Sequence, residues 1–246
     1  RLVGSEMLIR DRINNLGYNS SILLYSIHNM HLEKSKFNMI EQQIRTWNVL
    51  DESVLDLFRK YDRKLFVPKK YQGLAFADLE IPINDHASML APKVEAKIID
   101  SLDLNKKMKA LHVGTGSGFF TALLASHVSE LYTVDIDSEF IDHAQKVLKK
   151  NKIHNVKYIV SNGFNGYYQE APYDLMVFTA SHVKEPPGLR EQLKVGGQLF
   201  IFEGDQSLQY AKVIQRLSDS EYGIQTMFEA VIPQLIESWE PNKFLF

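Results

Sequence analysis

The segment Leu111-His112-Val113-Gly114-Thr115-Gly116-Ser117-Gly118 places three glycines directly after a short apolar run. The apolar run predicts a strand, and the residues after the glycines predict a helix that begins near Phe119. Glycines between a strand and a helix permit a tight turn and let a ligand approach the backbone closely. Free N–H groups at the helix start favour a polar or anionic group. We therefore predict a strand–loop–helix unit that holds a ligand at its loop.

Strands and helices alternate around and beyond this loop. The predicted strands cover residues 110–113, 131–136, 156–160, 175–179, 198–202, 212–217 and 224–232. The predicted helices cover residues 119–128 and 138–150, and Asp137 or Ser138 is the expected N-cap of the second. Alternation at this spacing is typical of a doubly wound, mostly parallel α/β sheet. The short link at residues 218–223 predicts an antiparallel hairpin at one edge of this seven-stranded sheet.

The spacing of the glycines distinguishes two kinds of nucleotide loop. A dinucleotide fingerprint needs a third glycine at position 119, where this chain has Phe119, so a dehydrogenase is disfavoured. Gly114, Gly116 and Gly118 instead resemble the nucleoside loop of S-adenosylmethionine-dependent methyltransferases. Asp135 ends the second predicted strand, and a carboxylate there can accept hydrogen bonds from both ribose hydroxyls. The alternative is a structural turn followed by an Asp that caps a helix.

The N-terminal part of the chain predicts helices and loops. Residues with helical spacing that suit one face are Met39, Ile40, Gln43, Ile44 and Trp47. Asp51 is the expected N-cap of a second helix, and Pro92 the expected first residue of a third. Residues 71–91 are loop-like.

Composition limits the class of protein. The chain has 246 residues, with 28 Lys and Arg against 30 Asp and Glu, a formal net charge of −2. A hydrophobic content of 45% and a charged content of 24% are ordinary for a globular protein, and no basic excess indicates a nucleic-acid partner. The absence of cysteine excludes disulfides and thiolate-held metals, and we expect no metal site. The apolar stretch at residues 22–27 is far shorter than the roughly 20 residues that span a bilayer, so we expect a cytoplasmic protein without a membrane partner.

Beyond the glycine loop, the sequence resembles the protein-L-isoaspartate O-methyltransferases, S-adenosylmethionine-dependent enzymes of protein repair. The resemblance runs from about residue 39 to residue 246, and several of its segments lie outside the general methyltransferase core. These segments are Met39-Ile40-Glu41-Gln42-Gln43-Ile44, Arg63-Lys64-Leu65-Phe66-Val67-Pro68, Ala75-Phe76-Ala77-Asp78, Leu90-Ala91-Pro92-Lys93-Val94-Glu95-Ala96, Asn155-Val156, Ala171-Pro172-Tyr173-Asp174 and Gln192-Leu193-Lys194-Val195-Gly196-Gly197. The resemblance also implies a natural start near Met30.

What the resemblance implies is a Rossmann-like class I methyltransferase. It would transfer a methyl group from S-adenosylmethionine to a carboxylate of an isoaspartyl residue in a damaged protein or peptide, and release S-adenosylhomocysteine. The residues implied to bind the cofactor are Met89, Leu90, His112, Gly114, Thr115, Gly116, Ser117, Gly118, Asp135, Ile136, Asn162, Gly163 and Thr179.

The same resemblance suggests a division of the chain. Residues 1–36 form an N-terminal extension, whose first residues, Arg1 to Glu6, are typical of a cloning remnant. Residues 37–246 form a single methyltransferase domain. Within it, residues 37–106 are a helical, substrate-side segment and residues 107–246 are the Rossmann-like core. The oligomeric state stays open.

Three positions depart from the family pattern. Leu90 occupies the position of a serine whose hydroxyl helps to position the substrate carboxylate. His112 replaces an acidic residue, so a fixed negative charge near the methionine end of the cofactor is lost. Asn162 replaces an Asp that contacts the adenine amino group, and its side-chain carbonyl can still accept that hydrogen bond.

Ser88 is the candidate for the missing hydroxyl. It lies two residues before Leu90, and side chains two apart in an extended segment share a face. We predict that Ser88 is a catalytic residue at the mouth of the substrate site; the alternative is a solvated loop serine or a helix cap. Methyl transfer to a carboxylate needs alignment and exclusion of water rather than a general base.

Leu90 also leaves two other functions open. One is a methyltransferase of the same fold with a different acceptor. The other is an S-adenosylmethionine-binding protein that has lost isoaspartyl activity.

Overall fold

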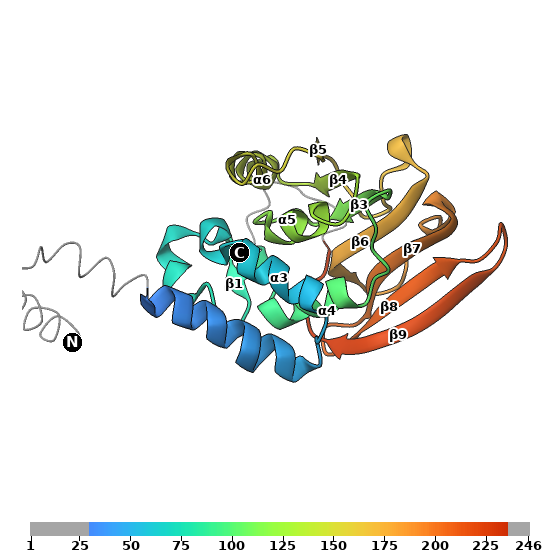
Figure 1. Ribbon diagram of the computed structural model, residues 1–246. Coiled ribbons are helices and arrows are strands. Elements are labelled where there is room, and N and C mark those ends of the chain that lie inside the picture. Colours follow the sequence, from blue (N-terminus) through green and yellow to red (C-terminus); the bar gives the residue numbers. More distant parts are fainter. Residues whose placement is uncertain (1–29, 236–246) are drawn as a thin grey trace, which may run out of the picture.

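The computed structural model describes residues 30–235, which are organised around a seven-stranded sheet (Figure 1). The strands lie in the order β5-β4-β3-β6-β7-β8-β9. Their bounds are β3 Lys109–Val113, β4 Glu130–Asp135, β5 Val156–Val160, β6 Tyr173–His182, β7 Leu193–Gly204, β8 Gln209–Arg216 and β9 Tyr222–Ala230. The pairs from β5 to β7 are parallel, and β7–β8 and β8–β9 are antiparallel. The predicted mostly parallel sheet with an antiparallel edge is confirmed.

Besides a helix at the start of the described residues, the α-helices of residues 30–235 are α3 Glu52–Lys60, α4 Pro92–Asp100, α5 Phe119–Ala125 and α6 Ser138–Lys150. The predicted N-caps are present: the Asp51 carboxylate accepts from Ser53 N, and the Asp137 carboxylate accepts from Glu139 N. Pro92 is the first residue of α4. Helix α5 is shorter than predicted, because the chain turns into i→i+3 hydrogen bonds after Ala125, as in the 2.9 Å bond from His127 N to Leu124 O.

Several strands differ in length from the predictions. β6 and β7 extend on both sides of the predicted residues 175–179 and 198–202. The apolar runs mark only the middle of each strand. Polar residues such as Asp174, His182 and Lys194 interrupt the apolar pattern in the extensions, although the backbone still pairs there. A break in the regular pairing of β6 with β7 lies between Val177 and Ser181, next to the ligand end of β6.

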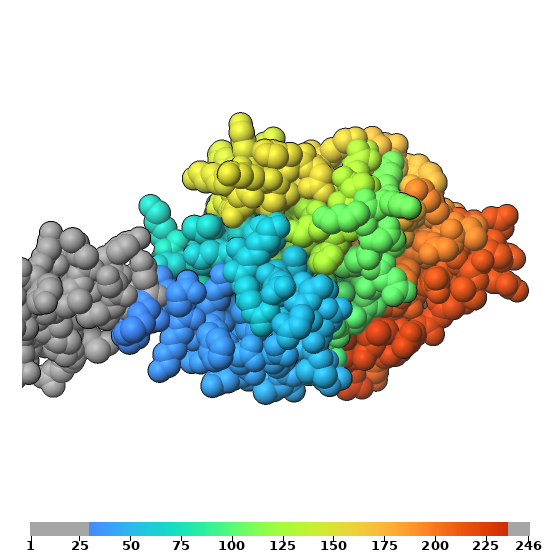
Figure 2. Space-filling view, in the orientation of Figure 1, coloured from blue at the N-terminus to red at the C-terminus, as the bar shows by residue number. Residues whose placement is uncertain are grey.

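Alternating side chains of the central strands enter two separate apolar cores. Ala110 of β3 and Phe200 of β7 face the core that includes residues of α3, α4, α5 and α6. Leu111 and Leu199, their neighbours in sequence, face the second core on the opposite side of the sheet. Figure 2 shows the N-terminal segments in blue and cyan lying over the green part of the chain that follows them. The α-helices thus cover one face of the sheet through the first of these cores.

The described chain begins with a helix at residues 30–38, which continues into the π-helical turn η1, Met39–Ile44, and the 3₁₀ turn η2, Arg45–Trp47. The predicted domain boundary between residues 36 and 37 lies inside this helix. Met39, Ile40 and Ile44 are buried as predicted, but Trp47 is 41% exposed, so its assignment to the buried face is wrong. Helix geometry ends at Asn48, which has φ 61°, and Trp47 instead packs beneath Lys93 Nζ, 4.3 Å from its ring centroid.

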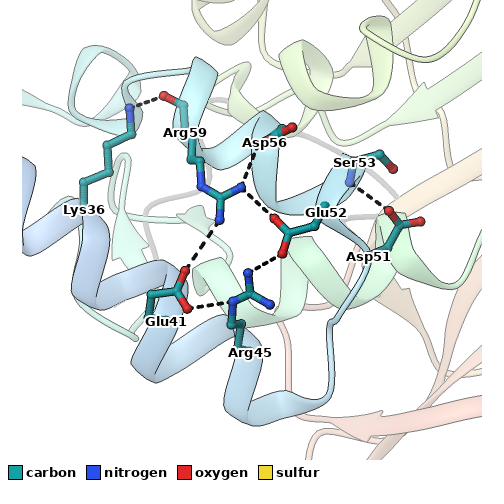
Figure 3. A network of polar contacts seen from close by, with 8 residues as sticks. All are labelled: Lys36, Glu41, Arg45, Asp51, Glu52, Ser53, Asp56 and Arg59. Atoms are coloured by element: carbon teal, nitrogen blue, oxygen red, sulfur yellow. Dashed lines mark hydrogen bonds and ion pairs between the residues drawn. The ribbon is translucent and has the colours of Figure 1, made fainter.

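Ion pairs join this N-terminal helix to α3 (Figure 3). Arg45 of the N-terminal helix pairs with Glu52 of α3, and Arg59 Nη2 of α3 lies 3.5 Å from Glu41 Oε1 of the N-terminal helix. Arg59 also pairs with Asp56 at 2.7 Å. The network lies at the surface, on the far side of α3 from its buried residues Val54, Leu55, Leu57 and Phe58.

The segment between α3 and α4 contains more structure than predicted. It includes the 3₁₀ turns η3, Arg63–Phe66, and η4, Lys69–Leu74, followed by a two-stranded antiparallel hairpin of β1, Ile81–Pro82, and β2, Ser88–Met89. The remaining 3₁₀ turns are η5, Tyr168–Glu170, and η6, Arg190–Gln192. Within residues 30–235, no helix has the length and apolar character needed to cross a membrane.

Candidate active site

A cleft opens where the parallel strands end at their carboxyl side. It has an empty volume of about 1030 Å³, which includes the solvent space of its open mouth. Open α/β sheets bind their ligands at this edge. The predicted site residues that line it are Ser88, Met89, Leu90, Gly114, Thr115, Gly116, Ser117, Asp135, Ile136, Asn162, Gly163 and Thr179. His112 and Gly118 do not line it.

The glycine loop forms the floor of the cleft. Gly114 has φ 95° and Gly116 has φ 48°, conformations that other residues rarely adopt. A Cβ on Gly114 would lie 2.8 Å from Thr179 Oγ1, and one on Gly116 would lie 3.1 Å from Ile83 Cδ1. The two glycines therefore leave a shallow cradle of bare backbone, which a flat nucleoside can approach closely.

Gly118 serves the fold rather than the cleft. Its φ is 81°, it is the N-cap of α5, and an added Cβ would lie 2.9 Å from Ala144 Cβ on α6. The third glycine therefore allows α5 and α6 to pack together. Sequence alone could not separate this role from ligand contact, because both require a glycine at the same spacing.

Asp135, at the end of β4, supports the loop and borders the cleft. Its Oδ2 accepts from Gly116 N at 2.9 Å, and its Oδ1 accepts from Asp137 N at 3.1 Å. Burial raises the pKa of the Asp135 carboxyl, and the hydrogen bond from Gly116 N opposes that shift. Each carboxylate oxygen has further acceptor capacity, as a ribose diol requires.

His112 lies beneath the loop in a chain of threonines. Its Nδ1 is 3.0 Å from Thr121 Oγ1 and 3.2 Å from Thr133 Oγ1, and its Nε2 is 3.0 Å from Thr179 Oγ1. Burial lowers the pKa of His112 to about 3, so the ring is neutral. The Thr179 hydroxyl donates to backbone carbonyls, the nearer being Gly114 O at 3.0 Å. We therefore assign the proton of His112 to Nε2, which donates to Thr179.

The β1–β2 hairpin forms another wall. Ser88 and Leu90 both line the cleft, as their spacing predicts. Leu90 is 5% exposed, and its carbonyl oxygen accepts from Arg63 Nη2. Among residues 30–235 the Ser88 hydroxyl has no hydrogen-bond partner, so it is available to a ligand.

Asn162 and Gly163 follow β5. The side-chain carbonyl of Asn162 accepts from Phe164 N at 2.8 Å, so it already stabilises its own turn. A Cβ on Gly163 would lie 2.6 Å from Val113 Cγ1, which makes glycine necessary there. The turn brings both residues to the cleft beside Ile136.

Some lining residues were missed by the sequence predictions. Pro233, Gln234 and Leu235 form a wall because this segment runs parallel to the end of β6: Ser181 N donates to Pro233 O at 2.9 Å, and Leu235 N donates to Ser181 O at 2.8 Å. No periodic pattern marks such a short segment. Others are Ile83, Asn84, Glu95, Phe120 and Phe140.

Glu95 did carry a sequence signal. It lies three and four residues before the buried Ile98 and Ile99, so it occupies the inward face of α4. Glu95 is 2% exposed and Arg63 is 0% exposed, and Glu95 Oε2 lies 3.3 Å from Arg63 Nε. Burial raises the pKa of Glu95 to about 7, although the nearby Arg63 opposes the shift.

Comparison with known proteins assigns the family. A family model for protein-L-isoaspartate(D-aspartate) O-methyltransferase matches residues 34–234. A protein-L-isoaspartate O-methyltransferase from Syntrophus aciditrophicus is 32% identical over 187 residues, covering 76% of this chain and 86% of the relative. One from Petrotoga mobilis is 32% identical over 208 residues, covering 82% of this chain and 98% of the relative. The chain belongs to the protein-L-isoaspartate O-methyltransferase family.

Solved structures share the fold of this methyltransferase family member. A protein-L-isoaspartate O-methyltransferase from Plasmodium falciparum, in complex with S-adenosyl-L-homocysteine, has a TM-score of 0.70 and 18% sequence identity, covering 82% of this chain and 98% of that one. A second protein-L-isoaspartate O-methyltransferase has a TM-score of 0.69 and 20% identity, covering 82% and 65%. The predicted class, an S-adenosylmethionine-dependent methyltransferase with a Rossmann-like fold, is confirmed.

Proposed function

We propose that the cleft binds S-adenosylmethionine and that the chain methylates the carboxylate of isoaspartyl residues in damaged proteins or peptides. The observation that carries the proposal is the convergence of the glycine loop, Asp135 and the Ser88–Leu90 wall on one cleft. Names of the relatives support the same acceptor. When bound, the cofactor supplies an activated methyl group.

The residues of the cleft fit this cofactor. The cradle at Gly114 and Gly116 accepts its sugar, and Asp135 binds the ribose hydroxyls. Ile136 and Phe140 offer apolar surface to the adenine ring, and Asn162 lies at the same end of the proposed site. Thr179, held by His112, faces the amino-acid portion.

The chain's contribution to the reaction is alignment. A carboxylate acceptor is already ionised at neutral pH, so the cleft need not hold a general base. Ser88 would position the acceptor by donating its hydroxyl hydrogen to one carboxylate oxygen. The apolar wall of Met89, Leu90 and Phe120 excludes water around the acceptor.

The test is transfer of a labelled methyl group to a peptide that contains isoaspartate, with the same peptide containing ordinary aspartate as the control. We expect transfer to the isoaspartyl peptide alone. Tight binding of S-adenosylhomocysteine without transfer to either peptide would favour a different acceptor or a lost activity. Both alternatives follow from the lack of a side-chain hydroxyl at Leu90. Failure to bind S-adenosylhomocysteine would overturn the proposal altogether.

A further inference from the structure

The acidic and basic side chains that line the cleft are all acidic, apart from one histidine. Asp135 and Asp137 border it after β4, and Glu95 borders it from α4. Of residues 30–235, no lysine or arginine lines it. S-Adenosylmethionine carries two positive groups, the sulfonium and the α-ammonium. The surroundings of the cleft therefore suit a cationic ligand, and each carboxylate is a candidate partner.

His112 cannot supply this negative charge. Its ring is neutral, it does not reach the cleft, and both nitrogens are engaged by threonines. Position 112 therefore offers the ammonium no charged partner, and such a partner must come from another element.

Glu95 is a buried carboxyl group that the proposed mechanism does not use. It contacts Arg63 through Oε2 only, at a long 3.3 Å, because Arg63 also donates to Ala75 O at 3.0 Å and to Leu90 O. Among residues 30–235, Glu95 Oε1 accepts no hydrogen bond. A buried carboxylate with so little compensation is costly unless a ligand supplies further donors.

The position of Glu95 separates it from the other two carboxylates. It lies in the first turns of α4, which begins two residues after Leu90, and so belongs to the wall assigned to the acceptor. Asp135 and Asp137 belong to the ribose side.

We propose that the Glu95 carboxylate, presented by α4, is the counter-ion of the cofactor's α-ammonium. This inference rests on the proposed placement of the cofactor in the cleft. Arg63 acts as a positioning residue: it fixes one oxygen of Glu95 and leaves the other for the ligand.

The test uses three ligands that differ only in their amino-acid portion. S-Adenosylhomocysteine has the ammonium, its deamino analogue lacks that group alone, and 5′-methylthioadenosine lacks the whole amino-acid portion. Calorimetry would measure their affinities for the wild type, for Glu95→Gln, and for Glu139→Gln. Glu139 is an exposed glutamate at the start of α6 that does not line the cleft, so it serves as the matched control.

We expect the wild type and Glu139→Gln to bind S-adenosylhomocysteine about tenfold or more tightly than the deamino analogue, as loss of a buried charge pair implies. In Glu95→Gln this preference should fall to less than about threefold, while affinity for 5′-methylthioadenosine stays unchanged. A wild type without the preference, or a Glu95→Gln variant that retains it, would overturn the proposal. If the wild type binds none of the ligands, the proposed function fails instead.

Loss of folding in Glu95→Gln would leave the wild-type complex as the deciding measurement. A crystal structure with S-adenosylhomocysteine should place its amino nitrogen within hydrogen-bond distance of Glu95 Oε1. An ammonium held by other groups, with Glu95 out of reach, would refute the assignment.

Discussion

Asp135 illustrates how one side chain can serve both the loop and a ligand. Its two oxygens each accept one backbone N–H, from Gly116 and Asp137. We expect Asp135→Asn to lower affinity for S-adenosylhomocysteine about 10- to 100-fold, because hydrogen bonds to a charged group are worth roughly 1.5–3 kcal/mol. Calorimetry measures this directly, and an unchanged affinity would rule out ribose binding by Asp135.

Ser88 supports a separate prediction about the acceptor. Replacing Ser88 by Ala should lower kcat/KM for an isoaspartyl peptide about tenfold, because one hydrogen bond to the acceptor carboxylate is lost. Affinity for S-adenosylhomocysteine should stay the same, since the loop and Asp135 are intact. Unchanged turnover would show that Ser88 is only a loop serine.

Burial of the neutral His112 ring should make the stability of the fold depend on pH. Its pKa falls from 6.5 to about 3 on folding, so between these values the unfolded chain binds a proton that the folded chain rejects. The free energy of unfolding therefore falls as pH decreases across this interval, by at most about 1.4 kcal/mol per pH unit. Glu95, whose pKa is raised from 4.5 to about 7, acts in the opposite sense between those two values.

The effect of His112 is measured as the difference in unfolding free energy between the wild type and a variant that cannot titrate at this position. Denaturant unfolding of the wild type and His112→Gln should be compared at several pH values from 7 to 4. Glutamine can still donate to Thr179 but does not titrate, so the wild type should lose more stability than the variant as pH falls below 6.5. Equal slopes would contradict the buried neutral imidazole.

At the scale of elements, the ion pairs between the N-terminal helix and α3 are exposed to solvent, whereas the pair of Arg63 and Glu95 is buried. Arg63 is fully buried and joins η3 to α4 and to the end of β2, so Arg63→Ala should cost about 3–5 kcal/mol by leaving Glu95 uncompensated. Arg59 is 40% exposed, and Arg59→Ala should cost much less.

Salt distinguishes the two variants further. In 1 M NaCl the small effect of Arg59→Ala on thermal unfolding should disappear, because exposed pairs are screened, whereas the effect of Arg63→Ala should persist. Comparable losses in both variants would contradict the difference in burial.

The sequence predicted those elements whose pattern is set by burial. The strands β3 and β4 and the helix α6 were predicted almost to the residue, because buried apolar runs and the cap at Asp137 mark them. The strand β5 was predicted to the residue as well, although none of its residues is fully buried. The β1–β2 hairpin was not predicted, since two residues per strand are too few to show a period. Trp47 was misplaced because residues 39–47 form a π-helical turn and a 3₁₀ turn, in which side chains do not follow the α-helical spacing that was assumed.

The candidate site was predictable to a similar extent. Residues on the loops after β3, β4 and β5 were found because glycine and aspartate are required there. Glu95 was missed although its spacing from Ile98 and Ile99 marks it as inward-facing, and Pro233 was missed because no periodic pattern marks so short a segment. His112 was expected in contact with the cofactor, but the pleat of β3 turns its ring toward α5.

At the scale of the whole molecule, ligand binding should appear as thermal stabilisation. A ligand that binds only the folded state at 100 times its Kd adds about 2.7 kcal/mol, which for a chain of this size raises Tm by roughly 5–11 °C. We expect this shift with S-adenosylhomocysteine and none with NAD. A shift with NAD alone would contradict the interpretation of the glycine loop.

The wall formed by residues 233–235 has a consequence for truncated forms of the chain. All seven strands are complete by Ala230, so none of these three residues belongs to a strand of the sheet. A stop codon placed directly after β9 should therefore leave every strand in place and remove one side of the cleft. Such a truncation would separate assembly of the sheet from completion of the cleft.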